Sequence, residues 1–350
     1  MALSDYREAL TPPLDRGPVF LDTSSAIQRD TLSEVLGAIR VAGGLFFRVQ
    51  LSPPYSVASL GADHVAAKYA PGAVRVLPFH LVTRGPIWFE VDGLSEPFRL
   101  EEGDVIVLPR GAEHTLTDRP GTPSVPIAAL DDHLDGFPPT LVWGGPGQAT
   151  EALCGFFQTE GRIFNPLVDA LPDVLVVHRG DPGADWLAST LRRTYGELAA
   201  GRPGGAALAR RLTESLFVEV VQRHLAGAAG AGWFAALADP VAGPVLALIH
   251  GQPDRRWSVD ALASEVGVSR TVLADRFAAS VGQSPIRYLT AWRLELAGQR
   301  LLETRDSVAE VACAVGYESE AAFNRAFKRF TGQPPAAWRR AQRPPPSLPA

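Results

Sequence analysis

Two stretches near the C-terminus share one pattern: Val259-Asp-Ala-Leu-Ala-Ser-Glu-Val-Gly267 and Val308-Ala-Glu-Val-Ala-Cys-Ala-Val-Gly316. Each places a small residue, Ala263 or Ala312, four positions before a glycine. Two helices that meet at a steep angle need a small side chain where they approach, and the turn between them needs a residue that tolerates positive φ. The spacing therefore predicts two helix-turn-helix units, over 258–280 and 307–330, whose second helices enter the major groove of DNA.

The residues downstream of the two copies also agree. Phe277 precedes Gly282-Gln-Ser-Pro285, and Phe327 precedes Gly332-Gln-Pro-Pro335 at the same distance. One alanine–glycine pair is common in helical hairpins, but two copies with matching endings favour a DNA-binding repeat over a plain helical repeat. Between the copies, the apolar residues of 284–303 predict one long helix that acts as a stiff spacer.

The large apolar residues of each second helix should face inward, because they lie at positions i and i+4. The residues left outward are the predicted DNA contacts: Arg270, Thr271, Ala274 and Asp275 in the first unit, and Glu320, Ala321, Asn324, Arg325 and Lys328 in the second. Arginine and asparagine suit bidentate hydrogen bonds to guanine and adenine, whereas threonine and alanine suit a thymine methyl group. The second helix is therefore expected to be the better hydrogen-bonding reader.

Residues 254–340 resemble the DNA-binding domain of the AraC/XylS family of bacterial transcription regulators. The resemblance is most specific over Ala309–Arg329 and the following Gly332-Gln-Pro-Pro335. It implies sequence-specific binding to double-stranded promoter DNA and activation through contact with RNA polymerase. We therefore expect a transcription regulator without catalytic residues or a cofactor, and not an enzyme.

Charge is distributed unevenly along the chain. The whole chain carries −5, but residues 254–343 have 14 Arg or Lys against 10 Asp or Glu, a net of +4 that leaves −9 for the rest. A positive tail on an acidic body is typical of a DNA-binding module attached to another domain. No apolar run approaches the roughly 20 residues that cross a bilayer, and two cysteines form no disulfide framework, so a cytoplasmic protein without a membrane span is expected.

The composition, with 46% hydrophobic and 20% charged residues over 350 positions, indicates several globular domains. Residues 15–135 contain short apolar strands separated by glycine and proline, which predicts a β-barrel. Gly103-Asp-Val-Ile-Val-Leu-Pro-Arg-Gly-Ala-Glu-His114 resembles the second motif of cupin barrels, and Phe79–Gly93 resembles the end of the first. The resemblance to AraC-type regulators with a cupin sensor implies a small-molecule effector, and the candidate ligand-binding residues are His80, Trp88 and His114.

A metal in this barrel is not expected. Metal-binding cupins begin their first motif with two histidines and a glutamate, but Pro78 occupies the glutamate position here and Pro71–Ala73 holds no histidine. A catalytic metal needs about three protein ligands. The alternative function, a metal-dependent cupin enzyme with a helical tail, would require recruitment of His64 or His80.

Residues 145–250 show helical periodicity with wide apolar faces. Those faces need partners, either in the same chain or in a second copy, so we expect a helical linker that supports a homodimer. Cys154 lies in an apolar context and Cys313 lies inside the first helix of the second helix-turn-helix unit. Both are expected to be buried and inert, although a redox-sensing regulator acting through Cys154 is an alternative. The expected fold is α+β multidomain: a cupin-like barrel over 15–135, a helical region over 145–250, and an all-α tandem helix-turn-helix domain over 254–340.

Overall fold

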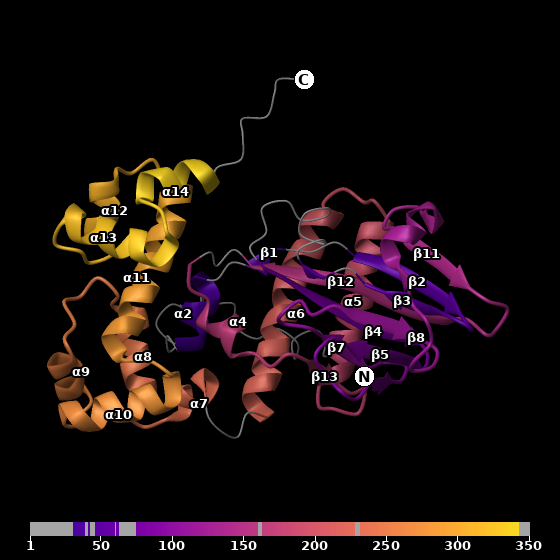
Figure 1. Cartoon of the computed structure of the whole chain (residues 1–350), viewed down its shortest axis with the longest axis horizontal. Coiled ribbons are helices and arrows are strands. Elements are labelled where there is room, and N and C mark those ends of the chain that lie inside the picture. The colour runs from indigo at the N-terminus through magenta and orange to yellow at the C-terminus, as the bar shows by residue number, and fades with distance from the viewer. Residues whose placement is uncertain are drawn as a thin grey trace, which may run out of the picture. The chain divides into compact units, whose positions relative to one another are not determined.

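The structure, a computed structural model, describes residues 31–38, 41–42, 46–59, 61–62, 75–159, 163–227 and 232–342. Within these ranges a sheet-rich part is followed by a helical part (Figure 1). This layout confirms the predicted α+β multidomain fold. None of the helices in these ranges is long and apolar enough to cross a membrane.

The strands form two sheets. The larger sheet contains β1 (Val41–Ala42), β2 (Phe46–Ser52), β4 (Arg75–Arg84), β7 (Val105–Val107), β10 (Leu134–Asp135), β11 (Thr140–Gly144), β12 (Thr150–Thr159) and β13 (Leu175–Val177). Its order is β10-β11-β2-β12-β4-β7-β13, with β1 paired to β12. The smaller sheet contains β3 (Ser56–Ala58), β5 (Ile87–Val91), β6 (Phe98–Leu100), β8 (His114–Thr117) and β9 (Val125–Pro126), in the order β6-β5-β8-β3-β9.

The central strands of the larger sheet are buried on both faces. In β4, Phe79 and Leu81 pack into the core shared with the helices, whereas Val82 packs into the core shared with the smaller sheet. In β12, Phe157 faces the helices and Cys154 faces the smaller sheet. Successive side chains of a strand point to opposite faces, so these strands supply two hydrophobic cores at once.

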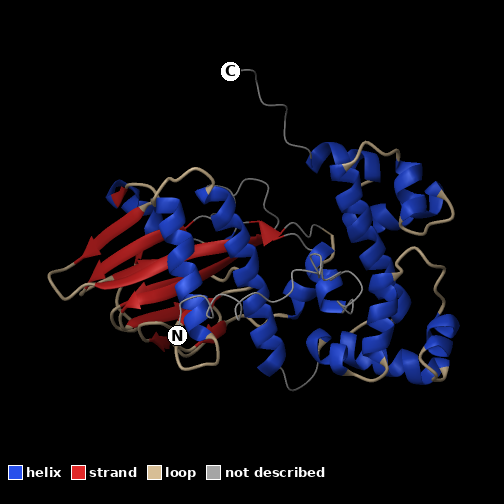
Figure 2. Ribbon diagram, turned by 180° about the vertical axis from the view of Figure 1, so that it is seen from behind, coloured by secondary structure: helices blue, strands red, loops and turns tan. Residues whose placement is uncertain are grey.

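Two long helices cover the larger sheet (Figure 2). They are α5 (Ala184–Ala199) and α6 (Gly205–Gly227), which pack on each other. The ring of Phe217 in α6 lies 5.5 Å from the ring of Phe157 in β12. Shorter elements complete this part: α2 (Thr31–Ala38), the 3-10 helix η2 (Ile127–His133), α4 (Pro166–Ala170) and α7 (Trp233–Ala238).

Two expectations about the sheet-rich part need correction. Neither sheet closes on itself among the described strands, so the cupin-like domain is a pair of open sheets and not a closed barrel. The sheet also continues past residue 135, because β11, β12 and β13 fall in or next to the range expected to be helical. The reason is burial on both faces, which removes the polar–apolar alternation by which a strand is recognised. The first residues of the predicted 15–135 domain lie outside the described residues.

The C-terminal part is a series of helices joined by short turns. They are α8 (Ala242–Gly251), α9 (Val259–Glu265), α10 (Arg270–Val281), α11 (Pro285–Glu303), α12 (Val308–Ala314), α13 (Glu320–Thr331) and α14 (Pro335–Gln342). We call α9 and α10 the first reading unit, and α12, α13 and α14 the second reading unit. The single helix α11 connects them, as the spacer expected over 284–303 (Figure 1).

Candidate nucleic-acid interface

Both reading units have the turn geometry that the repeat predicts. Gly267 and Gly316 adopt positive φ, at +70° and +85°, between the two helices of each unit. Ala263 and Ala312 are buried at the approach of those helices. The N–H of the residue after each glycine closes the turn, since Val268 donates to the carbonyl oxygen of Ala263 and Tyr317 to that of Ala312, at 3.0 and 2.9 Å.

Serines start the helices of each unit. The side chains of Ser269 and Ser319 accept hydrogen bonds from Val272 N–H and Ala322 N–H at the first turns of α10 and α13. Such caps satisfy backbone donors that have no partner inside the helix. These two serines therefore mark where α10 and α13 begin.

Replacing the turn glycines by alanine should separate backbone strain from crowding. A Cβ on Gly267 would meet nothing within 4 Å, whereas a Cβ on Gly316 would lie 2.5 Å from the carbonyl oxygen of Asp254. We expect Gly267→Ala to cost about 1–2 kcal/mol for the left-handed backbone. Gly316→Ala should cost a further 1–3 kcal/mol, roughly the penalty for overpacking.

Urea unfolding of the two variants and the wild type measures the difference. Equal losses at the two glycines would show that the loop at Asp254 relaxes away from the new Cβ. A larger loss at Gly267 would contradict the turn geometry.

The second helix of each unit presents a polar face to solvent. Leu273 and Phe277 in α10, and Phe323 and Phe327 in α13, are fully buried. The nine residues singled out from the sequence are exposed or half-buried: Arg270, Thr271, Ala274, Asp275, Glu320, Ala321, Asn324, Arg325 and Lys328. The inward and outward faces of both helices therefore agree with the i, i+4 interpretation.

Some basic side chains on these faces have no carboxylate partner among the described residues. Arg270 lies 3.7 Å from Asp260, and Asn324 donates to Glu320 at 3.4 Å. Within the described part of the chain, Arg325 and Lys328 make no ion pair. Unpaired cations on an exposed helix face are suited to bind an anionic partner.

Arg276 pairs with a carboxylate outside its own helix. Its guanidinium lies 3.0 Å from the carboxylate of Asp239, between α7 and α8. The same carboxylate accepts hydrogen bonds from Val241 N–H and Ala242 N–H. The pKa of Asp239 is lowered despite partial desolvation, because these backbone donors and Arg276 favour the charged form.

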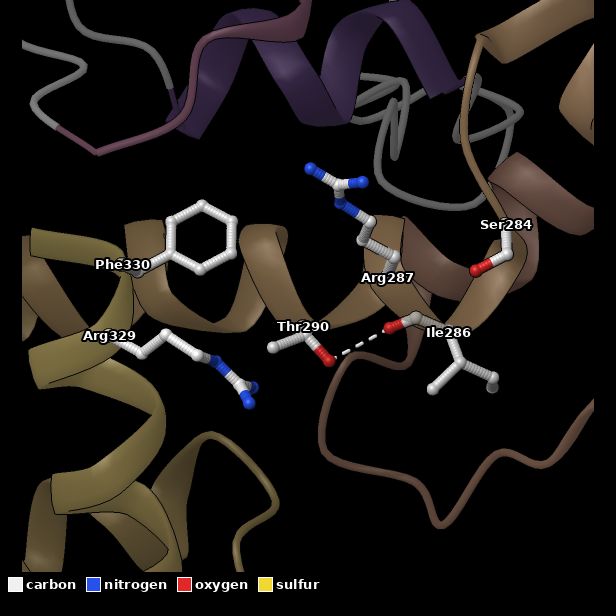
Figure 3. Close-up of a pocket in the computed structure, with 6 residues that line it drawn as sticks. All are labelled: Ser284, Ile286, Arg287, Thr290, Arg329 and Phe330. Atoms are coloured by element: carbon white, nitrogen blue, oxygen red, sulfur yellow. Dashed lines mark hydrogen bonds between the residues drawn. The ribbon is translucent and has the colours of Figure 1, made fainter.

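A hollow of about 630 Å³ lies between the start of α11 and the end of α13. Figure 3 shows Arg287 of α11 and Arg329 of α13 around it, together with Phe330. Among the described residues neither arginine forms an ion pair. Sequence reasoning missed Arg287 because it considered only the second helix of each unit, and it ended the contacts of α13 at Lys328, one residue before the exposed Arg329.

Two buried histidines face each other between the sheets. The Nε2 atoms of His80 in β4 and His114 in β8 are 2.7 Å apart. His114 Nδ1 lies 3.0 Å from the carbonyl oxygen of Ala112 and 2.8 Å from the hydroxyl of Ser59. With Nδ1–H of His114 donating to the carbonyl oxygen of Ala112, Nε2 of His114 accepts a hydrogen bond from Nε2–H of His80. Nδ1 of His80 then carries a lone pair, and this atom has no hydrogen-bond partner among the described residues.

Burial keeps this histidine pair neutral. Desolvation lowers the pKa of His114 to about 4, although the bond to Ala112 opposes the shift. Desolvation, assisted by His114, lowers the pKa of His80 well below its ordinary value. The histidines are therefore a neutral polar pair among the apolar side chains between the two sheets.

Trp88 does not join the histidine pair. In β5, Ile87, Phe89 and Val91 are buried between the sheets, and the ring of Phe89 lies 5.3 Å from that of His80. Trp88 alternates with them, so its side chain points to the other face of the sheet. Phe89 occupies the place that the sequence interpretation gave to Trp88.

The donors for a metal are also incomplete. Among the described residues no three His, Cys, Asp or Glu lie close enough together to hold a metal ion. His64 lies outside the described residues. The histidine pair alone does not provide the ligands of a catalytic centre.

The two cysteines differ from each other. Cys154 is buried in β12 opposite His80, and burial raises the pKa of its thiol, so a reactive thiolate is disfavoured there. Cys313 is exposed on α12, and the expectation that it is buried was wrong. Position 313 lies one residue after the inward-facing Ala312, which places it on the solvent side of a short helix.

Comparison with known proteins agrees with this geometry. Residues 30–226 match a family described as Cupin, and residues 262–341 match one described as Helix-turn-helix domain. A putative AraC-like transcription regulator of Streptomyces lividans is 38% identical over 271 residues, which are 77% of this chain and 88% of that protein.

Two further similarities span different parts of the chain. The HTH-type transcriptional regulator AlkR of Acinetobacter baylyi is 27% identical over 316 residues, 89% of this chain and 99% of that protein. The crystal structure of the AdpA DNA-binding domain in complex with a target DNA is 32% identical and covers 29% of this chain and 92% of that one, with a TM-score of 0.28. The long match to the Streptomyces protein and the cupin match over more than half of the chain decide the assignment: the chain belongs to the AraC-type transcription regulators that carry an N-terminal cupin domain.

Proposed function

We propose that this regulator reads two adjacent elements of promoter DNA, with α10 in one major groove and α13 in the next. The observation that carries the proposal is the pair of helices with exposed polar faces on one continuous spacer, α11. Successive major-groove entries on one face of DNA are about 34 Å apart, so a rigid spacer selects elements at a set separation.

The side chains suggest how each element is read. Arg325 binds a guanine edge and Asn324 an adenine edge, since both can make two hydrogen bonds to those bases. In the first unit, Thr271 and Ala274 contact a thymine methyl group, and Asp275 accepts from cytosine. The other proposed contacts are Arg270, Glu320, Ala321 and Lys328.

Phosphate contacts position the helices. Lys328 and the arginines of the hollow, Arg287 and Arg329, lie beside the readers and have no carboxylate partner among the described residues. Neutralising DNA phosphates releases counterions, which gives affinity without sequence preference.

The sheet-rich domain is proposed to sense a small molecule. Its ligand site would include the histidine pair, because His80 offers a buried Nδ1 without a partner among the described residues, in an apolar interior. An effector shifts activity only if it binds two arrangements of the chain with different affinity. We further propose that the protein is cytoplasmic, forms a homodimer through α5 and α6, where Trp186 and Leu208 are exposed, and activates transcription by contacting RNA polymerase.

The test compares Arg325→Ala with Lys328→Ala on α13. After selection of the preferred DNA, Arg325→Ala should lose roughly 1–3 kcal/mol at one base position and relax the preference there. Lys328→Ala should weaken binding to all sequences alike and reduce the slope of log affinity against log salt by about 1. Fluorescence anisotropy with single-base variants of the site, at several salt concentrations, measures both effects.

The two variants serve as controls for each other, because both side chains are exposed cations on one helix. If Arg325→Ala behaves like Lys328→Ala, then α13 does not read bases through Arg325. If the wild type binds all DNA sequences equally, the proposed function fails.

A further inference from the structure

Two neighbouring residues, Ile163 and Phe164, pack on the spacer α11 and against the hydrophobic clusters that include residues of the two reading units; we call them the connector. They follow β12 of the larger sheet and precede α4. The ring of Phe164 lies 5.3 Å from that of Tyr288, which packs 5.8 Å from Phe277 of α10. Phe164 thus packs against the large hydrophobic cluster that joins the sheet-rich domain, α8 and the first reading unit.

Ile163 packs against the second reading unit. It belongs to the core of the second reading unit, beside Trp338, whose ring lies 5.5 Å from that of Phe327 in α13. Adjacent residues of the connector therefore pack against two separate hydrophobic clusters. Each of them is one aromatic ring away from a helix that is proposed to read DNA.

A buried carboxylate on the spacer holds the connector in place. Glu295 of α11 is 1% exposed, and its Oε2 accepts hydrogen bonds from Ile163 N–H at 2.8 Å and Phe164 N–H at 3.0 Å. Its Oε1 accepts from Gln299 at 3.1 Å. A buried charge is costly unless hydrogen bonds satisfy it, so the Glu295 carboxylate is fully hydrogen-bonded only while the connector packs on α11.

A glycine on the spacer makes room for the connector. A Cβ on Gly298 would lie 2.8 Å from Cδ1 of Ile163 and 3.3 Å from Cη2 of Trp338. Glycine is disfavoured inside helices, so its presence in the middle of α11 needs a packing reason, and Ile163 supplies it. Gly196 of α5 offers a contrast, since a Cβ there would meet nothing within 4 Å.

The same strand that leads to the connector passes the histidine pair. Cys154 in β12 is the direct cross-strand neighbour of His80 in β4. A change in the space between the sheets therefore acts on a strand that ends at Thr159, shortly before the connector.

We infer that the connector is the joint through which the sensory domain holds both reading units in one arrangement, with Glu295 as its latch and Gly298 as its socket. The inference rests on the proposed function, because it concerns two units that bind adjacent DNA elements. The helix α11 joins the two reading units covalently, and the docked connector adds non-covalent contacts between the sheet-rich domain and the clusters of both units. Undocking should loosen the relative orientation of the units without unfolding either of them.

The experiment uses the full chain and variants of the socket. Gly298→Ala puts a Cβ against Ile163 Cδ1, and adding Ile163→Val in the same chain removes that atom. Amide hydrogen exchange at Ile163 and Phe164 reports docking. Affinity for the selected two-element DNA, and for the same DNA with one base pair inserted between the elements, reports the arrangement of the units.

We expect Gly298→Ala to speed exchange at both amides and to lower affinity for the two-element DNA by about fivefold or more, the lower end of coupling between sites. The preference for native over inserted spacing should fall with it. The double variant should recover both properties. Gly196→Ala, the matched substitution on α5, should change neither.

The latch provides an independent pair of variants. Glu295→Ala removes the acceptor and should behave like Gly298→Ala, whereas Glu295→Gln keeps a carbonyl oxygen that accepts both N–H groups and should retain the native spacing preference. Faster exchange with unchanged affinity and spacing preference in both Gly298→Ala and Glu295→Ala would overturn the joint while leaving DNA recognition intact. Absence of any sequence preference in the wild type is a different result and would refute the proposed function instead.

Discussion

Phe327→Ala is expected to lower the free energy of unfolding of the second reading unit by about 3–5 kcal/mol, the range for removal of a buried phenyl ring. The Phe327 side chain is fully buried, and its ring lies 5.4 Å from Phe323 and 5.5 Å from Trp338. Its removal leaves a cavity in the middle of the cluster that joins α11 to α14, where rigid aromatic neighbours limit collapse. Amide exchange over α12–α14 measures the loss locally.

Phe330→Ala is the matched control, since it removes the same ring from the same helix. Phe330 is 38% exposed, so its removal should change stability by roughly 0.5 kcal/mol or less if it behaves as a surface site. The Phe327→Ala variant should no longer bind DNA that carries only the second element, but it should still bind DNA that carries only the first element. Equal effects at the two positions would mean that the second reading unit is not packed around Phe327.

The C-terminal helices could be predicted closely because their signals are local. Each turn of a reading unit depends on one glycine, one alanine and one serine within about ten residues of sequence, which is typical of a helix-turn-helix motif with its own sequence signature. Gly267 and Ser269, for example, determine where α9 ends and α10 begins without reference to the rest of the chain. The position of α11 followed from its apolar period alone.

The sheet-rich domain could be predicted only in part, since its geometry depends on contacts between distant strands. The apolar runs predicted short strands in this part of the chain, but the pairing of His80 with His114 depends on the arrangement of several strands. A register shift of one residue would move either histidine to the opposite face. The same limit explains the misplaced Trp88.

Long-range polar contacts were out of reach for a similar reason. Glu295 reads as one more charge on an amphipathic helix, yet it is buried against Ile163 and Phe164, more than a hundred positions earlier. Arg276 likewise pairs with Asp239, 37 positions earlier in the chain. In both cases the partner is selected by how helices pack, which a single sequence does not encode in any local pattern.

Acidification is expected to destabilise the sheet-rich domain through the histidine pair. The folded-state pKa of His114 is lowered from 6.5 to about 4 by burial, so the unfolded chain binds a proton that the folded chain excludes. Stability is therefore present above pH 6.5 and is lost as pH falls from 6.5 toward 4. His114 alone accounts for about 2 kcal/mol between pH 7.5 and pH 5, and His80 adds to the loss because its pKa is lowered as well.

Urea unfolding at pH 7.5 and pH 5 measures this loss, and a variant isolates its source. His114→Asn, which does not titrate, should be less stable at pH 7.5 but should lose less on acidification than the wild type. His250 has a buried imidazole with a pKa lowered to about 3, and it destabilises the helical part in the same direction. That contribution is common to both proteins, so the difference in their pH dependence belongs to the histidine pair. If His114→Asn and the wild type lose equal stability, the pair is not the neutral, water-excluded feature on which the proposed sensory site depends.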